Sequence, residues 1–141
     1  MKKTTRIFTV ATVVVLIVAA LVSCGGEENK NVWDDAIYKE STMLGSGSKT
    51  VIVELKVEEN FITFTLFTDA STVGAALVEH GLIEGEEGAY GMYVKKVNGI
   101  TADYDVDGHY WAFYIDGEYA LTGVDTTAID AGRVYRLEYA K

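Results

Sequence analysis

Three alternating aspartates form the part of this sequence best suited to chemistry. They lie in residues 103–108, which read Asp-Tyr-Asp-Val-Asp-Gly. Alternate carboxylates in a tight loop can converge on one hard cation, and glycine permits the sharp bend that such a loop needs. The run predicts a candidate metal site at Asp103, Asp105 and Asp107, with Ca²⁺ as the first cation to consider.

The aspartate run does not have the pattern of an EF-hand. In a loop beginning at Asp103, the twelfth residue is Tyr114 instead of the expected bidentate Glu, and a strand is predicted to follow instead of a helix. A calcium loop between strands could be completed by Asp125, Glu118 or a carbonyl. The alternative is a solvated turn whose side chains bond their own backbone. His109 beside the run suggests either a transition-metal ligand or an ordinary surface histidine.

Aromatic residues are dense between positions 90 and 119. If residues 109–115 form a strand, Trp111 and Phe113 share the face that packs under a helix, while Tyr110 and Tyr114 share the opposite face. Tyr110, Tyr114 and Tyr93 are therefore the candidate ligand-binding residues, for a flat ligand or a partner protein. Packing of the same rings against neighbouring strands is the alternative.

Motifs of catalysis are missing from the sequence. It contains no G-x-S-x-G, no P-loop, no H-E-x-x-H and no dinucleotide-binding glycine pattern. Its two histidines, His80 and His109, fall on different predicted elements. The acidic stretch 84–88 is expected to be a mobile, solvated loop. We therefore expect a protein that is not an enzyme.

The first residues resemble a bacterial lipoprotein signal. Residues 1–6 carry Lys2, Lys3 and Arg6, and residues 7–22 are apolar apart from two threonines. That run is shorter than a comfortable membrane span, which favours a secretory signal. Residues 21–24, Leu-Val-Ser-Cys, are similar to the lipobox of lipoproteins. The resemblance implies cleavage before Cys24 and lipid on its thiol, and so an extracytoplasmic domain attached to the cell membrane.

Composition agrees with export and argues against nucleic acid as a partner. Cys24 is the only cysteine, so no disulfide can form within the chain. The net charge is −9, and loss of the basic leader makes it more negative. Nucleic-acid phosphates require Lys and Arg for their neutralisation. The expected partners are the membrane, through the lipid, and a small ligand or a surface protein.

The mature chain divides into a tether and one domain. We assign residues 1–23 to the signal peptide, 24–48 to the lipidated cysteine and a polar, glycine-containing tether, and 49–141 to the folded domain. Part of the segment 32–44 could dock back onto the domain, because it contains Trp33, Ala36 and Tyr38.

The pattern of the domain is mostly β. Period-two alternation predicts strands at 51–57 and 62–66, joined as a hairpin by Glu59-Asn60. A helix follows, capped by Ser71 and ended by Gly81. Further strands are predicted at 92–97, 109–115, 118–121 and 134–139, with turns at Asn98-Gly99 and Asp116-Gly117. This order predicts a mostly β, α+β fold, in which one helix lies across a grasp-like antiparallel or mixed sheet.

An ordered series of motifs resembles a known family. It comprises Thr-Val-Gly-Ala-Ala-Leu at 72–77, Tyr-Val at 93–94, Val-Asn-Gly at 97–99, Tyr-Trp-Ala-Phe-Tyr-Ile-Asp-Gly at 110–117 and Gly-Val at 123–124. The series is similar to bacterial domains of unknown function that resemble the C-terminal domain of transcobalamin and intrinsic factor. In the animal carriers this β-rich domain closes over cobalamin bound mainly on a separate helical domain. The resemblance implies the fold more directly than the ligand, and cobalamin is a candidate ligand on this ground.

The leader makes a direct prediction about the mature N-terminus. Mass spectrometry of the native protein should find Cys24 as the first residue, with its thiol acylated. An intact Met1 leader, or a free thiol on Cys24, would contradict lipid anchoring.

Overall fold

A computed structural model describes residues 30–141. The signal peptide 1–23, the acylation of Cys24 and residues 25–29 lie outside the described residues. Residues 31–141 form one compact unit. Its elements are the 3₁₀ helix η2 (Val32–Asp35), the helices α1 (Val73–Glu79) and α2 (Tyr104–Asp107), and the strands β1 (Thr42–Gly45), β2 (Lys49–Val57), β3 (Asn60–Thr68), β4 (Ile83–Gly88), β5 (Gly91–Val97), β6 (Ile100–Thr101), β7 (Tyr110–Ile115), β8 (Glu118–Tyr119) and β9 (Val134–Ala140).

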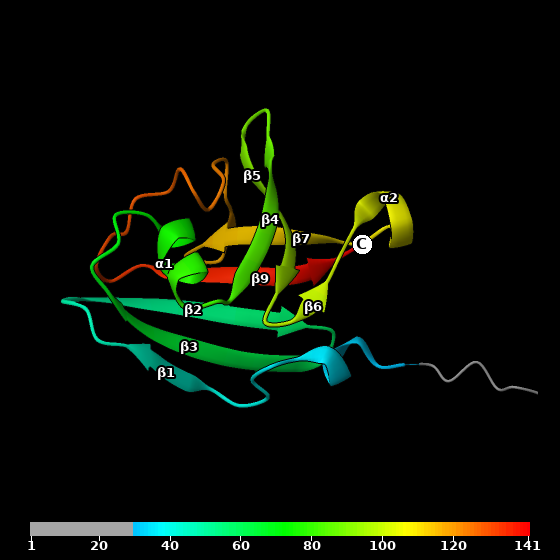
Figure 1. Cartoon of the computed structure of the whole chain (residues 1–141), viewed down its shortest axis with the longest axis horizontal. Coiled ribbons are helices and arrows are strands. Elements are labelled where there is room, and N and C mark those ends of the chain that lie inside the picture. Colours follow the sequence, from blue (N-terminus) through cyan, green and yellow to red (C-terminus); the bar gives the residue numbers. More distant parts are fainter. Residues whose placement is uncertain (1–29) are drawn as a thin grey trace, which may run out of the picture. The chain divides into compact units, whose positions relative to one another are not determined.

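The strands form two sheets. The larger sheet has the order β1-β3-β2-β9-β7-β8, and the smaller has the order β4-β5-β6. In the large sheet β1–β3 and β2–β9 are parallel and the other pairs are antiparallel. Figure 1 shows α1 and the small sheet crossing over the strands of the large sheet. The expected α+β, grasp-like mixed sheet with one helix across it is confirmed, and the small sheet is a second cover beside the helix.

One face of the large sheet is the apolar wall of the core. Val53 pairs with Phe64 and Val51 with Leu66, and all four side chains are buried. Alternate residues point the same way in a strand, so each apolar residue of the pattern faces inward. The core cluster also contains Leu77 from α1. Burying each such side chain contributes about 1.5–3 kcal/mol to stability.

The helix α1 begins one residue later than predicted. Thr72, not Ser71, is its N-cap, and Thr72 Oγ1 accepts a hydrogen bond from Ala75 N at 3.2 Å. The carbonyl of Ser71 instead accepts a hydrogen bond from Ile129 N at 3.1 Å. Both residue types can cap a helix, and the tertiary pairing of Ser71 decides between them. Gly81 follows the last turn with φ +67, as expected for a stop signal.

The acidic stretch 84–88 is a strand and not a loop, so that prediction was wrong. Ile83–Gly88 forms β4 and pairs antiparallel with β5, with an irregularity between Glu84 and Gly85. Its residues from Glu84 onward are exposed, as predicted. The backbone pairing to β5 supplies the order that the local composition does not indicate. Two smaller differences from the prediction are that β8 ends at Tyr119 and not at Leu121, and that residues 104–107 form the single-turn helix α2.

The folded unit starts at Asn31 and not at Lys49, because the segment after Asn31 is fastened to the core. Ala36 is buried, and the ring of Tyr38 meets that of Phe64 edge to face at 5.7 Å. This confirms that part of 32–44 docks on the domain. Among the described residues, no helix has the length and apolar character that crossing a bilayer requires.

Asn98 is the residue that holds this segment. It is fully buried, its Oδ1 accepts a hydrogen bond from Tyr38 N at 2.9 Å, and its Nδ2 donates to Tyr38 O at 2.8 Å. Its backbone carbonyl also accepts from Ile37 N at 2.9 Å. Asn98 has φ +50, in the left-handed region that asparagine tolerates better than most residues. The Asn-Gly turn thus supplies both a bend and a polar clamp.

Replacing Asn98 should therefore destabilise the fold. Asn98→Ala leaves both backbone groups of Tyr38 unpaired and puts alanine, which tolerates positive φ less well than asparagine, at φ +50. We therefore expect a loss of roughly 3 kcal/mol in the free energy of unfolding. Asn98→Gly removes the clamp without the strain and should lose about 1 kcal/mol less. Urea unfolding measures both.

A matched control is Asn60→Ala, because the side chain of Asn60 makes a long 3.4 Å bond to Val57 O. We expect it to change stability by about 0.5 kcal/mol or less. Equal losses for Asn98→Ala and Asn60→Ala would show that the clamp does not stabilise the domain.

Candidate functional site

The carboxylates of Asp103 and Asp107 are used by the chain itself. Asp103 Oδ1 accepts from Asp105 N at 3.2 Å, and its Oδ2 lies 3.4 Å from Lys95 Nζ. Asp107 Oδ1 accepts from His109 N at 2.8 Å. These are the local turn bonds that aspartate forms with its own backbone. Two of the three predicted metal ligands thus have structural roles at the ends of α2.

His109 and the two proposed completing residues lie in different surroundings. The ring of His109 stacks on Tyr139 at 4.6 Å, and its Nδ1 is 3.5 Å from Asp107 Oδ1. Asp125 accepts a hydrogen bond from Met92 N, and Glu118 lies on β8. The part of the chain that the structure describes contains no group of three or more His, Cys, Asp or Glu residues placed to hold a metal ion.

Tyr110 and Tyr114 lie on β7, and their neighbours Trp111 and Phe113 are buried in the core. The guanidinium of Arg136 lies 5.3 Å from the Tyr114 ring centre. Tyr114 also meets Tyr119 edge to face at 5.6 Å, and Tyr110 meets Tyr104 at 6.5 Å. Alternation along the strand therefore puts Tyr110 and Tyr114 on the face away from the core, half-buried among other side chains.

Tyr93 is not part of that surface. It lies on β5 of the small sheet, which covers the core side of the large sheet, and Lys95 Nζ lies 5.9 Å from its ring centre. The three candidate tyrosines are thus divided between the two sides of the large sheet. The structure does not bring them into one site.

A small hollow lined by uncharged residues lies between β5 and β7. Its volume is about 160 Å³. Trp111, Phe113 and Leu137 line it, and all three are buried core residues. The other lining residues are Met92, Tyr93 and Val94 from β5, Tyr119 from β8, and Ala120, Thr122, Gly123 and Val124 from the segment after β8. An apolar cavity of about 150 Å³ can accept a benzene-sized group.

A larger hollow, whose lining includes charged residues, shares Tyr119, Ala120 and Thr122 with the small one. Its volume is about 650 Å³, within the usual range of ligand pockets. Its other lining residues are Ile115, Glu118, Leu121, Thr127, Ala128, Ile129, Asp130, Arg133 and Tyr135. We call the two hollows together the β8 cleft. It offers one ligand a small compartment lined by uncharged residues and a larger compartment with charged ones.

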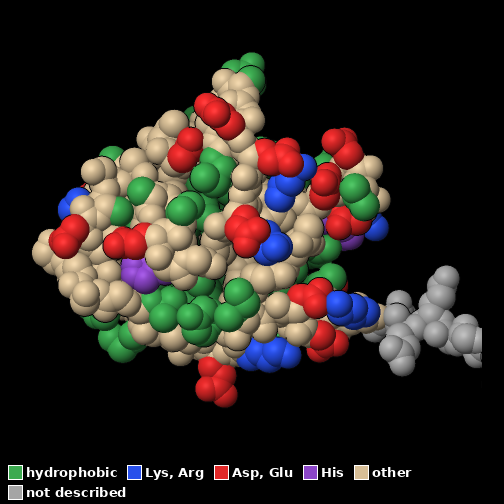
Figure 2. Space-filling view, in the orientation of Figure 1, with side chains coloured by type: hydrophobic (Ala, Val, Ile, Leu, Met, Phe, Trp, Pro, Cys, Tyr) green, Lys and Arg blue, Asp and Glu red, His purple; other side chains and the backbone are tan. Residues whose placement is uncertain are grey.

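Large apolar side chains stand exposed around the β8 cleft. Leu121 is 99% exposed and Tyr119 is 59% exposed. Tyr90, in the turn of the β4–β5 hairpin, is 96% exposed, and a β-carbon on Gly123 would lie 3.8 Å from its carbonyl oxygen. Figure 2 shows an apolar side chain at the end of this projecting hairpin. Exposed apolar groups that gather beside a hollow are typical of binding surfaces.

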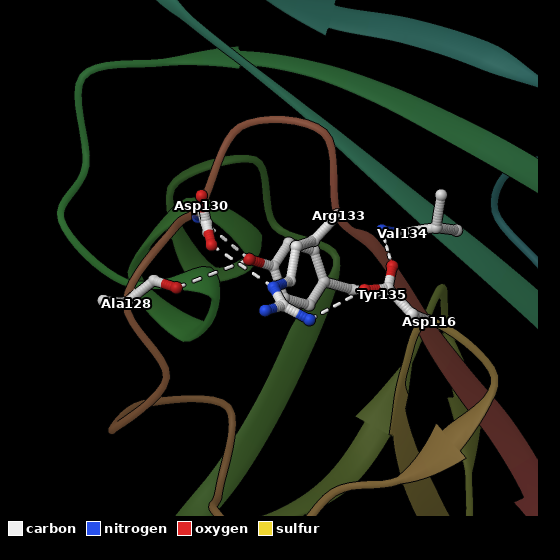
Figure 3. Close-up of polar contacts among 6 residues, drawn as sticks. All are labelled: Asp116, Ala128, Asp130, Arg133, Val134 and Tyr135. Carbon is white, nitrogen blue, oxygen red and sulfur yellow. Dashed lines mark hydrogen bonds and ion pairs between the residues drawn. The ribbon is translucent and has the colours of Figure 1, made fainter.

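Arg133 organises the polar wall of the cleft. Its Nη1 donates to Asp116 Oδ2 at 2.8 Å and its Nε donates to Asp130 Oδ2 at 3.2 Å (Figure 3). Hydrogen bonds with Asp130 and Asp116 raise the pKa of Arg133 above its ordinary value. The hydroxyl of Tyr135 accepts from Asp130 N at 3.0 Å and lies 3.4 Å from Ala128 O. The segment before β9 is thereby tied to the β7–β8 turn.

The sequence did not point to Arg133, Asp130 or Tyr135 as site residues. The signal that could have found them is the segment 120–133, which carries no helix or strand. Long irregular segments within a compact domain are commonly functional. Of the two partners of Arg133, Asp130 is close in sequence, whereas Asp116 belongs to a distant turn that no local pattern connects with Arg133.

Comparison with known proteins places the fold. A family model described as "Domain of unknown function (DUF4430)" matches residues 70–141. The crystal structure of "a putative metal binding protein from Ruminococcus gnavus ATCC 29149" is similar, with a TM-score of 0.62 and 28% identity over 67% of this chain and 98% of that chain. Haptocorrin in complex with Cbi matches with a TM-score of 0.48 and 19% identity, over 70% of this chain and 27% of that chain. No curated protein matches.

Asp116 makes the Arg133 network sensitive to acid. The backbone N–H of Val134, and then Arg133, hold the pKa of Asp116 below its usual value of 3.8. A carboxyl whose pKa is lowered on folding stabilises the fold above the unfolded value, and this contribution is lost as the pH falls through the lower folded value. Asp116→Asn keeps an acceptor for Val134 N at a position with φ +51, which asparagine tolerates.

We expect Asp116→Asn to lower stability at pH 6, and the difference from wild type to shrink below pH 3.8. Urea unfolding at both pH values measures it. Asp105→Asn is the control, because no hydrogen bond or ion pair of its carboxylate occurs among the described residues. A wild-type advantage that is unchanged in acid would contradict the role of the Asp116 charge.

Proposed function

This chain belongs to the DUF4430 family, and we propose that it is a non-catalytic binding module, held outside the cell by lipid on Cys24, whose β8 cleft receives a small ligand. The observation that carries the proposal is the cleft itself. Trp111 and Phe113 form an apolar floor, and a polar hollow opens directly beside it. Ligand sites commonly combine a largely apolar lining with a few placed polar groups.

The charges of the cleft favour a neutral or cationic ligand. Arg133 is the cation of the polar hollow, and it faces the carboxylates of Asp116 and Asp130, while Glu118 also lines the hollow. An anionic ligand would meet this excess of carboxylates and be repelled. A ligand with an apolar ring and amide or hydroxyl groups would match both compartments.

A role in binding accords with how the polar groups of the cleft are used. Arg133 holds two aspartates, and the hydroxyl of Tyr135 bonds the backbone at Asp130. These bonds stiffen the walls, and a stiff, preformed site loses less entropy when a ligand enters.

A corrinoid is the first ligand to test, because the sequence resembles the C-terminal domain of transcobalamin and intrinsic factor. A whole corrinoid, ring and amide side chains together, is larger than either hollow. It would therefore lie across the rim, against Tyr119 and Leu121, with a peripheral group in the cleft. The exposure of these two side chains leaves them available for such contact.

A second candidate is a metal-binding surface domain. The similar Ruminococcus gnavus protein carries the description "putative metal binding protein". In this chain Asp103, Asp105 and Asp107 remain the first ligands to test, with Ca²⁺ as the first metal. Binding would require Asp103 and Asp107 to leave the turn bonds that they make now.

Titration of the domain with cobinamide, followed by the visible spectrum, tests the first candidate. Thr122 is exposed and lines both hollows, so Thr122→Trp should fill the cleft and weaken binding at least about tenfold. Tyr110→Ala, on the other face of the sheet, should bind like wild type. If millimolar cobinamide causes no spectral change, the proposal that the ligand is a corrinoid is wrong. If only Tyr110→Ala abolishes binding, the ligand site lies on the face of the large sheet away from the core.

The purified domain can also be used to test calcium binding. If Ca²⁺ binds the aspartate run, a chelator lowers the melting temperature and Asp105→Ala abolishes that response. A melting temperature that is equal with and without chelator rules out calcium as a structural ion.

A further inference from the structure

Asp125 joins two walls of the small hollow. Its Oδ2 accepts a hydrogen bond from Met92 N at 2.9 Å. Met92 begins the β5 wall, whereas Gly123 and Val124, directly before Asp125, belong to the opposite wall. The small sheet has no strand pairing with the large sheet. At this point β5 is therefore held by a side-chain hydrogen bond and not by backbone pairing between strands.

Two glycines enclose the carboxylate of Asp125. A β-carbon on Gly91 would lie 2.6 Å from Oδ1 and 2.8 Å from Oδ2, and one on Gly123 would lie 3.0 Å from Oδ1. Gly91 also has φ +107, which side-chain-bearing residues rarely adopt. Both positions thus require the absence of a side chain, because the carboxylate occupies the space.

The backbone of Asp125 is fixed from its other side by α1. Gly74 N donates to Val124 O at 2.7 Å, and Val73 N donates to Thr127 O at 2.9 Å. A β-carbon on Gly74 would lie 2.8 Å from Asp125 Cα, so the helix approaches this segment closely. The anchor is therefore rigid, and the hydrogen bond to Met92 transmits that rigidity to β5.

One oxygen of the carboxylate has no visible structural use. Oδ1 is buried and has no hydrogen-bond partner among the described residues. A buried carboxylate oxygen without a donor lowers stability. Such groups in folded proteins call for a functional explanation or a tightly bound water. In Asp125 the loss of stability at Oδ1 accompanies the hydrogen bond of Oδ2 with Met92 N, which sets the distance between two walls of the cleft.

We propose that Asp125 is a positioning residue, a latch between β5 and the segment 123–124 that sets the width of the small hollow. This inference rests on the proposed function, because it assigns a ligand-gating role to the same cleft. With the bond made, Met92–Val94 stand over Trp111 and Phe113. When the bond opens, β5 at Met92 can move away from the segment 123–124, so that the hollow widens and its floor becomes more accessible.

The latch can be tested by hydrogen exchange without any ligand. Asp125→Ala should accelerate exchange of the amides at 92–94 about tenfold, the factor expected for loss of a hydrogen bond to a charged group. Exchange in β2 and β3 should not change. Asp125→Asn keeps an oxygen acceptor and should restore slow exchange at Met92.

Asp69→Ala is the matched control. Asp69 also accepts a backbone hydrogen bond through its carboxylate, from Ser48 N at 2.9 Å, but in another part of the domain. It should leave exchange at 92–94 unchanged. A uniform rise in exchange across the domain in Asp125→Ala, or no rise at 92–94, would overturn the latch.

Fluorescence reports the floor of the hollow directly. In a Trp33→Phe background Trp111 is the remaining tryptophan, and acrylamide should quench it more strongly in Asp125→Ala than in Asp125→Asn.

If wild type binds cobinamide, Asp125→Ala should change the Kd for cobinamide about tenfold, while Asp125→Asn should not. If wild type binds none, the proposed ligand fails, whereas exchange and quenching still decide the latch. Equal quenching in the two variants counts against it.

Discussion

Burial of one apolar face of the six-stranded sheet is the constraint on which the rest of the structure depends. The inward side chains of β2, β3, β7 and β9 form a continuous wall, and α1 and the β4–β5–β6 sheet are its two covers. Neither cover extends the sheet by backbone pairing, so both are held by side-chain packing and by a few polar bonds. A cover fastened in this way can leave a gap, and the β8 cleft lies where β5 approaches β7.

The polar bonds that join distant segments of the domain lie mostly where the chain has no regular structure. Asn98 binds the segment around Tyr38, Asp125 binds β5, and Arg133 connects the segment 120–133 to the β7–β8 turn. Each joins pieces that are distant in sequence. Asparagine and aspartate can do this because their short side chains present oxygen acceptors close to the backbone. The cleft is therefore bounded largely by irregular segments that side-chain hydrogen bonds hold in place.

Local sequence explains why the aspartate run looked like a metal loop. The same Asp-x-Asp-x-Asp-Gly spacing suits a cation or a single helical turn with capping at both ends, and in the structure Asp103 and Asp107 make the turn bonds. The tyrosines show a related limit. Alternation correctly separated Tyr110 and Tyr114 from Trp111 and Phe113, but it contains no information on where β5 folds, so Tyr93 could not be assigned to a side of the sheet.

By itself, the sequence determined most of the longer strands, the single covering helix and the turns at Asn98-Gly99 and Asp116-Gly117, because periodicity and turn chemistry act between neighbouring residues. Only the tertiary structure decided that residues 31–48 belong to the domain, that 84–88 is a strand, and that Arg133 meets Asp116. These outcomes depend on partners far along the chain. A residue's local pattern does not state which distant group will satisfy its hydrogen bonds, and the cleft is built from such pairs.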